Sequence, residues 1–311
     1  DPGKSLVFSR RLPPADSLDT QGFVNGLLKT RAEQLAKARP EHADQVEEYR
    51  QQFGPVYRTA LMAKTPAAED LRWWPAEGGT KGRERVIISR ISAGDRVQGL
   101  LARPSGAVRG AALIVHPDGA QAALGTAESP TPLARDLSKR GILLLSVDTF
   151  QTGAARDAER RTRVGFFTCY NRTEDIERVQ DILTALAWLE AAWKPGKVSV
   201  VGQGMAGLWC LLARPFFPKD YAVAADAAGF DSSKDESYVE KLYVPLLRRA
   251  GDFQSAAWLA PASPLLLHNA GSGFAGGAYQ HAYTLHGASD RLRVSEAEVS
   301  AIYVAEWLAK A

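Results

Sequence analysis

The sequence has few of the residues that form disulfide frameworks and metal centres. Its 311 residues include two cysteines, Cys169 and Cys210, and five histidines that lie far apart along the chain. Two cysteines are too few for a disulfide framework or a cysteine-rich zinc site. We therefore expect two buried thiols and no bound metal ion.

The chain also lacks an excess of either charge and any long apolar run. It carries 38 basic and 35 acidic side chains, which are interspersed and give a net charge of +3. This balance leaves no basic footprint for nucleic acid. No apolar stretch approaches the roughly 18 residues that a membrane span requires. We predict a globular protein with neither a nucleic acid nor a membrane as its partner.

Strand-like alternation is missing from residues 1–80. Apolar residues recur there at helical spacing over 18–38 and 41–63, and residues 2–14 are typical of an extended arm. These patterns predict a helical N-terminal extension or linker. A second domain is predicted over 81–311.

From residue 81 onward, apolar strands alternate with amphipathic helices. A pair of antiparallel strands is predicted over 84–104. Six further strands are predicted at 110–116, 142–150, 197–202, 222–230, 263–271 and 281–287. Helices are predicted at 131–141, 173–193, 208–213 and 295–311. The fold class is therefore α/β, with a mostly parallel sheet of eight strands that helices cover on both faces.

One stretch, VSVVGQGMAG at 198–207, fits two different kinds of site. As a nucleophile elbow, G-x-S-x-G, it would lift a serine above the sheet, but Gly204 occupies the serine position. As a dinucleotide loop, G-x-G-x-x-G, it would use Gly202, Gly204 and Gly207 to admit a pyrophosphate, with Asp226 for the ribose. A dinucleotide loop normally opens its βαβ unit, whereas a hairpin and two βα units come first here. The order of elements therefore favours the elbow.

That order resembles the α/β-hydrolase fold. GAALIVHPDGA, the RGILLLSVDTFQTG turn, the RVQDILTALAWL helix and the elbow together resemble the acetylxylan-esterase-like branch of the superfamily. The resemblance covers 84–311, and the helical part before it resembles the linker and lobe of tandem esterases, whose second lobe often has a degenerate elbow. It implies serine-dependent cleavage of acyl esters on plant-wall polysaccharides or similar molecules, in an exported protein. The chain begins with Asp1 rather than Met, so we expect a processed or truncated product.

The resemblance also implies where the catalytic groups stand. In the hydrolase order, an acid follows the seventh strand and a histidine follows the eighth. We therefore expect His286 near the elbow, with Asp226 or Asp290 as the acid. The oxyanion donors and the pocket lining would come from the loop after the third strand, from the elbow and from the segment before the long helix. These residues are His116, Pro117, Asp118, Gly119, Gln203, Met205 and Arg172.

Gly204 separates this chain from the family that it resembles. Glycine has no side chain to attack a carbonyl carbon, so no acyl-enzyme forms at this position. Three functions stay open: a catalytically silent lobe that binds or scaffolds, a hydrolase with His286 as general base, and a dinucleotide binder through Gly202, Gly204 and Gly207. For the silent lobe we expect an ester or carbohydrate ligand, or pairing with an active esterase domain or subunit, and no cofactor.

Overall fold

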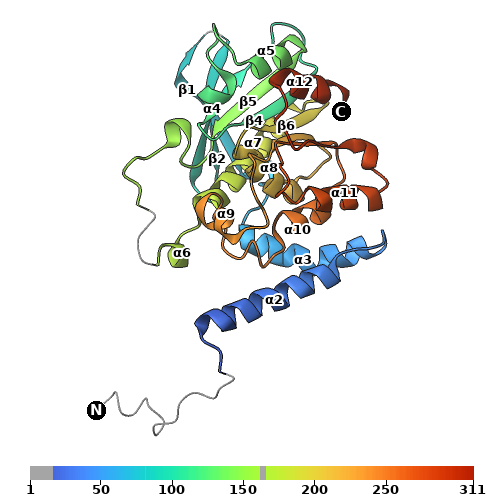
Figure 1. Ribbon diagram of the computed structural model, residues 1–311. Coiled ribbons are helices and arrows are strands. Elements are labelled where there is room, and N and C mark those ends of the chain that lie inside the picture. Colours follow the sequence, from blue (N-terminus) through green and yellow to red (C-terminus); the bar gives the residue numbers. More distant parts are fainter. Residues whose placement is uncertain (1–16, 81, 162–165) are drawn as a thin grey trace, which may run out of the picture. The chain divides into compact units, whose positions relative to one another are not determined.

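The computed structural model describes residues 17–80, 82–161 and 166–311, so the arm predicted at 2–14 lies outside the described residues (Figure 1). The chain divides into two compact units, Asp1–Pro40 and Glu41–Ala311. In the first unit, helix α2 (Thr20–Ala38) confirms the predicted helix. Its cap is Asp19, whose carboxylate accepts the N–H of Gly22 at 2.6 Å.

The second unit begins well before residue 81. Helix α3 (Gln45–Leu61) belongs to it: the Tyr57 hydroxyl donates to the carbonyl of Leu212 at 3.1 Å, and the Tyr49 hydroxyl lies 2.6 Å from Ser255 Oγ. Strand β1 (Leu71–Thr80) joins its sheet. The sequence assigned 41–80 to the extension because helical spacing alone does not show which helices pack on a sheet.

Within the described residues of the second unit, nine strands form a single sheet. They are β1, β2 (Arg83–Arg90), β3 (Asp95–Ala102), β4 (Gly110–Val115), β5 (Ile142–Asp148), β6 (Val198–Gly202), β7 (Ala222–Asp226), β8 (Leu265–His268) and β9 (Leu292–Val294). Their order is β1-β2-β3-β5-β4-β6-β7-β8-β9 (Figure 1). The pairs β1–β2, β2–β3 and β3–β5 are antiparallel, and all the others are parallel. The predicted α/β class and mostly parallel sheet are confirmed.

Two details of the predicted eight-stranded sheet are wrong. Residues 281–287, predicted as a strand, cover the end of helix α11 (Gly276–Leu285), in which the buried side chains of Tyr279, Ala282 and Tyr283 follow helical spacing. The last strand is instead β9, whose three residues are too few to show an alternating pattern. The additional strand is β1, which lies at one edge of the sheet.

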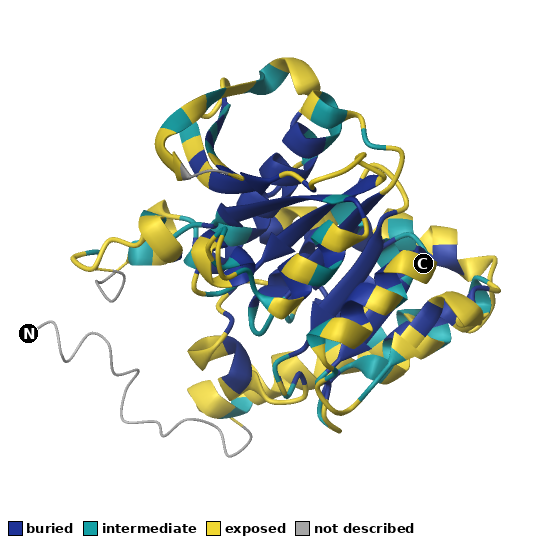
Figure 2. Ribbon diagram, turned by 90° about the horizontal axis from the view of Figure 1, so that it is seen from above, coloured by how far each residue is buried: buried dark blue, intermediate teal, exposed yellow. Residues whose placement is uncertain are grey.

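Helices cover both faces of the sheet, whose strands are mostly buried (Figure 2). On one face lie α4 (Ala120–Leu124), α5 (Pro132–Lys139) and α12 (Ala301–Lys310), which share an apolar core with the strands. On the other face lie α7 (Glu174–Trp193) and α8 (Ala206–Ala213), and α10 (Asp252–Leu259) packs between α8 and α3. The short helices are α6 (Phe167–Tyr170) and α9 (Asp235–Glu240), and 3-10 turns lie at Ala68–Asp70, Gly153–Ala155, Arg214–Phe216 and Ser289–Arg291. Among the helices that the structure describes, none combines the length and apolar character of a bilayer span.

Candidate functional site

The Gly-rich turn joins β6 to α8 on the side of the sheet where the carboxyl ends of the parallel strands lie. Its central residue, Gly204, has φ +51°, the left-handed backbone of a tight strand-to-helix turn. The turn is held by the N–H of Gln203, which donates to the carbonyl of Val115 on β4 at 2.9 Å. A Cβ atom on Gly204 would meet only the ring of Pro117, at 3.6 and 3.8 Å. The turn therefore keeps the shape of a nucleophile elbow and has space for a side chain, but lacks the nucleophile.

The two outer glycines of the motif are explained by close packing. A Cβ atom on Gly207 would lie 2.0 Å from the carbonyl oxygen of Asp226, and one on Gly202 would lie 2.5 Å from the Cα of Gly207. Glycine at both positions lets α8 lie directly against β6 and β7. The Asp226 carboxylate also accepts the N–H of Gly204 at 3.2 Å, so a negative charge occupies a donor that a pyrophosphate would use. This geometry disfavours the dinucleotide interpretation of Gly202, Gly204 and Gly207.

The loop after β4 offers no N–H to an oxyanion between residues 117 and 119. Pro117 has no N–H group. The N–H of Asp118 donates to Nδ1 of His116, and the N–H of Gly119 donates to the carbonyl of His116, both at 3.0 Å. Burial lowers the pKa of His116, which keeps Nδ1 available as an acceptor. A hydrolase needs one oxyanion donor from this loop, and here these donors are absent or used inside the loop.

The structure contradicts the predicted place of His286. This residue ends α11 and precedes β9, whereas Gly204 follows β6, and β6 to β9 all run in the same direction. His286 therefore lies near the amino end of β9, whereas the elbow lies at the carboxyl end of β6, on the opposite side of the sheet. The prediction failed because the segment before His286 is a helix and not a strand. Its Nε2 is 3.5 Å from Nη2 of Arg50 on α3, and burial, then the charge of Arg50, lowers the pKa of His286. Asp290 is exposed in the next turn, on the same side of the sheet as His286, and is not an acid for the elbow.

The two loops where hydrolases carry the acid and the histidine are bonded to each other. Counted from β2, the seventh and eighth strands are β8 and β9. The N–H groups of Asn269, Ala270 and Gly271 donate to the carbonyls of Ala297, Ser295 and Glu296, at 3.0, 3.2 and 3.0 Å. Residues 269–271 include no carboxylate and residues 295–297 include no histidine. The acid and histidine positions of the hydrolase order are thus filled by other residues.

A carboxylate does lie beside the elbow, at the end of β7. Asp226 is buried, and its second carboxylate oxygen accepts the N–H of Ala228 at 2.7 Å and the side-chain amide of Asn269 at 2.8 Å. Together with the bond from Gly204, these contacts involve both oxygens. Asp226 was predicted as an alternative catalytic acid, and the structure places it next to the elbow as an acceptor for the turn itself.

His268 is a residue on this side of the sheet that the sequence did not single out. It ends β8 in register with Asp226 on β7 and is buried. Burial lowers the pKa of His268, against the opposing effects of Asp226 and Glu298, and its Nδ1 has no hydrogen-bond partner among the described residues. The signal that could have found it is the pair of adjacent parallel strands that both end in a titratable residue.

The other predicted pocket residues are in two places. Gln203 and Met205 are half-buried on either side of the central glycine, as the elbow prediction requires. Arg172 lies elsewhere: it pairs with Glu177 on α7 at 3.3 Å and donates to the carbonyl of Met62 at 3.0 Å. Its guanidinium thus connects α7 to the end of α3.

The cysteines are only partly as predicted. Cys210 is buried in α8, and burial raises the pKa of its thiol, which makes it a poor nucleophile. Cys169 is exposed, contrary to the prediction of two buried thiols. Within the described residues, no group of three or more His, Cys, Asp or Glu side chains is placed to hold a metal ion.

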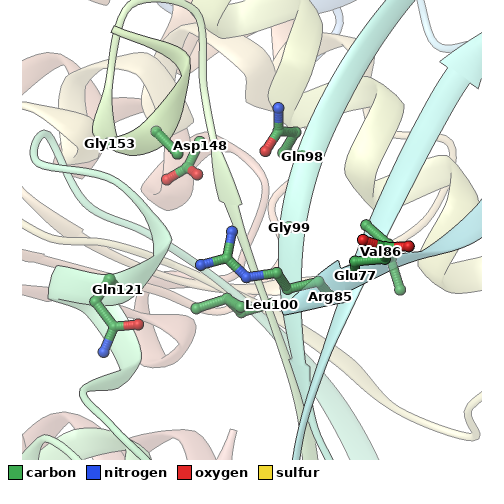
Figure 3. A pocket seen from close by; sticks show the side chains of 11 residues that line it. Glu77, Arg85, Val86, Gln98, Gly99, Leu100, Gln121, Asp148 and Gly153 are labelled. Atoms are coloured by element: carbon green, nitrogen blue, oxygen red, sulfur yellow. The ribbon is translucent and has the colours of Figure 1, made fainter. Parts of the chain in front are cut away.

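The structure also contains a cavity of about 210 Å³ that the sequence did not predict (Figure 3). It lies along β1, β2 and β3, next to α4 and the end of β5. Its polar lining consists of Glu77, Arg85, Gln98, Gln121 and Asp148. No residue of the 202–207 turn lines it. We call it the bulge pocket, after the irregular part of β1 at its border.

Comparison with known proteins identifies the fold. No protein-family model and no curated protein matches the sequence. A solved structure from Bacteroides fragilis NCTC 9343, described as a candidate acetyl xylan esterase, is similar with a TM-score of 0.60 and 13% identity, over 89% of this chain and 82% of that chain. Acetyl xylan esterase 1 from Thermoanaerobacterium sp. JW/SL YS485 has a TM-score of 0.43 and 12% identity, over 78% of this chain and 84% of that chain. The strand order and the first of these likenesses show that the protein has the α/β-hydrolase fold.

Proposed function

We propose that the protein is a catalytically silent α/β-hydrolase-fold lobe, which acts by binding or scaffolding rather than by hydrolysing an ester. The observation that carries this proposal is Gly204 at the centre of a well-formed elbow. The positive φ, the bond to β4 and the space above the residue all suit a nucleophile, and the residue itself supplies none. Covalent catalysis through an acyl-enzyme has no atom to start from.

The surroundings of the elbow support the same proposal. The loop after β4 uses its N–H groups at Asp118 and Gly119 internally, and Pro117 has none. The segment 295–297 after β9 carries no histidine to act as a general base. The loss therefore extends to three components of the mechanism, each on a different loop.

A silent lobe acts through what it binds. An ester or carbohydrate ligand suits a fold whose neighbour in Bacteroides fragilis is described as a candidate acetyl xylan esterase. The macromolecular partner we propose is an active esterase domain or subunit, with which this lobe would pair.

The proposal is tested by hydrolysis of p-nitrophenyl acetate, a small activated ester. We expect the native protein and a Gly204→Ala variant to match a blank that contains no protein. Turnover by the native protein that is lost in Asp226→Asn or His268→Gln would overturn the proposal, since these are the titratable residues at the strand ends next to the elbow. A catalytic serine esterase, assayed in parallel, shows that the conditions support turnover.

A further inference from the structure

Strand β1 departs from regular pairing at the border of the bulge pocket. Residues 77–79 lie between two regular pairs and face the single residue Glu84 of β2, so β1 contains two extra residues there. Gly78, at φ +83°, provides the left-handed backbone in this segment. Bulges re-aim side chains and are over-represented next to functional sites. The bulge in β1 is therefore expected to set the direction of the side chains at the border of the pocket.

The bulge positions a cation in the pocket. The Nε of Arg85 donates to the carbonyl oxygen of Gly78 at 3.2 Å, so the bulge holds the guanidinium by its inner nitrogen. Figure 3 shows the guanidinium pointing toward the side of the pocket where Gln121 and Asp148 lie, which come from α4 and the end of β5. Asp148 itself accepts the N–H of Ala120 at 2.8 Å, and this bond fixes the opposite wall.

The charges in the pocket decide what kind of ligand fits. Glu77 and Asp148 are acids, and Arg85 is the cation among the lining residues, so an anionic ligand would meet an unfavourable net charge. Burial raises the pKa of Asp148, while the N–H groups of Ala120 and Ala154 and, to a smaller extent, the charge of Arg85 oppose that rise. A ligand with a single charge would be attracted by the groups of opposite sign and repelled by those of the same sign.

Hydroxyl groups match this mixture of partners. A guanidinium only donates and an ionised carboxylate only accepts, whereas each hydroxyl does both. The carboxamides of Gln98 and Gln121 also donate and accept, and Val86 and Leu100 supply an apolar surface for carbon-bound hydrogens. At about 210 Å³ the cavity is smaller than the roughly 300–1,000 Å³ of a drug-sized site. The ligand must therefore be small, compact and rich in hydroxyl groups.

We propose that the bulge pocket binds a small neutral polyhydroxylated molecule, of about the size of one monosaccharide ring. Arg85 and Gln121 donate to its hydroxyl oxygens, and Asp148 and Glu77 accept from its hydroxyl hydrogens. The site shares no residue with the elbow, so it goes beyond the proposed loss of catalysis and does not depend on it.

The experiment measures binding of D-glucose and D-xylose to the whole chain by ligand-observed NMR, with glycine and acetate as zwitterionic and anionic probes. We expect the two sugars to bind and the other probes not to bind. Arg85→Met and Gln121→Leu, on different elements, should each weaken sugar binding about tenfold or more, since each removes hydrogen bonds to the ligand. Arg135→Met, an exposed arginine of α5, is the matched control and should leave binding unchanged.

Three results would overturn the proposal. The first is no sugar binding by a folded native chain at concentrations up to tens of millimolar. The second is sugar binding that Arg85→Met and Gln121→Leu leave unchanged while both variants keep the native melting temperature. The third is binding of glycine or acetate that depends on Arg85 when the sugars do not bind. None of these results alters the outcome of the ester assay, so the two proposals fail separately.

Discussion

The elbow and the bulge pocket differ in how many of their polar groups face a cavity. At the elbow, Asp226 accepts from three donors of the turn and its neighbours, and the loop after β4 bonds to its own His116. In the bulge pocket, the Arg85 guanidinium is held at one nitrogen and faces a cavity lined by two acids and two carboxamides. Both regions hold the backbone with a carboxylate, since Asp148 accepts the N–H of Ala120 at 2.8 Å. The bulge pocket in addition presents a guanidinium and two carboxamides to a cavity.

The comparison shows that close packing alone can account for two of the glycines in the elbow motif. Gly202 and Gly207 are required by the contact between α8 and the strands beneath it, whether or not the turn carries a nucleophile. The shape of the elbow therefore persists as a packing requirement of the fold. The bulge pocket has no such motif, because its polar residues come from five separate elements.

The largest effect is expected for Gly207→Ala, which tests the packing requirement. The new Cβ atom would lie 2.0 Å from the Asp226 carbonyl oxygen, a contact that forces α8 away from β7. We expect loss of folding or destabilisation by about 4 kcal/mol or more in chemical denaturation. Gly204→Ala is the matched control: its space is open, and the positive φ costs about 1–2 kcal/mol. Equal stability of the two variants would contradict the packing explanation.

The stability of the loop after β5 is linked to pH through Asp181 on α7. Its buried carboxylate accepts the N–H of Phe150, in the loop after β5, at 2.7 Å. Burial raises the pKa of Asp181 to about 8, with Asp95 and Glu177 adding to the rise and Arg90 opposing it. Because the pKa is higher in the folded state than in the unfolded state, the bound proton stabilises the fold near pH 4. That stability is lost as the pH rises toward 8.

Asp181→Asn removes this titration and keeps a neutral acceptor for the Phe150 N–H. We expect the variant to match the native protein in free energy of unfolding near pH 4. At pH 9 it should be more stable by several kcal/mol, because the native carboxylate is then ionised in a buried place. Urea denaturation at both pH values checks the prediction. A difference between the proteins that does not change with pH would contradict the assigned role.

Asn269→Ala tests whether the carboxylate beside the elbow acts structurally. The change removes the amide that donates to Asp226 at 2.8 Å and places alanine at φ +54°. We expect a loss of about 2 kcal/mol in the free energy of unfolding. Asn269→Gly removes the same bond without the backbone strain, so it should lose about 1 kcal/mol. If neither variant is destabilised, Asp226 does not depend on this donor.

The smallest effect on stability is expected for Arg85→Met in the bulge pocket. The Arg85 side chain is half-buried, and in the described part of the chain its guanidinium bonds to the carbonyl of Gly78 within an edge hairpin. We expect a change within about 0.5 kcal/mol, far below that of Gly207→Ala. Thermal denaturation of both variants gives the comparison directly. A large loss for Arg85→Met would make this side chain a structural group rather than a ligand-facing one.

The sequence predicted the parts of the fold that have strong local patterns. The continuous apolar strands from β4 to β8 and the helices α5, α7 and α12 are confirmed, because burial on both faces imposes runs that periodicity detects. It missed β1, whose Trp73-Trp74-Pro75 and paired glycines do not alternate. It also mistook α11 for a strand, since a segment as short as 281–287 fits both periods.

Only those parts of the candidate site that lie within one short stretch of sequence could be predicted. The elbow and its missing nucleophile follow from Gly202-Gln203-Gly204, and the place of Asp226 follows from the end of its strand. His286 was misplaced because its position depended on counting strands, and one strand was assigned wrongly. The bulge pocket brings together residues far apart in sequence, such as Arg85 and Asp148, and one sequence holds no signal for their proximity.

The measurement that tests the central claim most directly is the activity of Gly204→Ser. The serine fits the space beneath Pro117 and restores the elbow motif. The variant is assayed with p-nitrophenyl acetate and treated with an organophosphonate that labels activated serines, with adducts detected by mass spectrometry. The account predicts a folded variant that matches the blank and forms no adduct, because the oxyanion donor of the loop after β4 and the histidine after β9 are also missing. Turnover above the blank, or one adduct per chain on the new serine, would show that the loss is confined to Gly204 and would contradict the account.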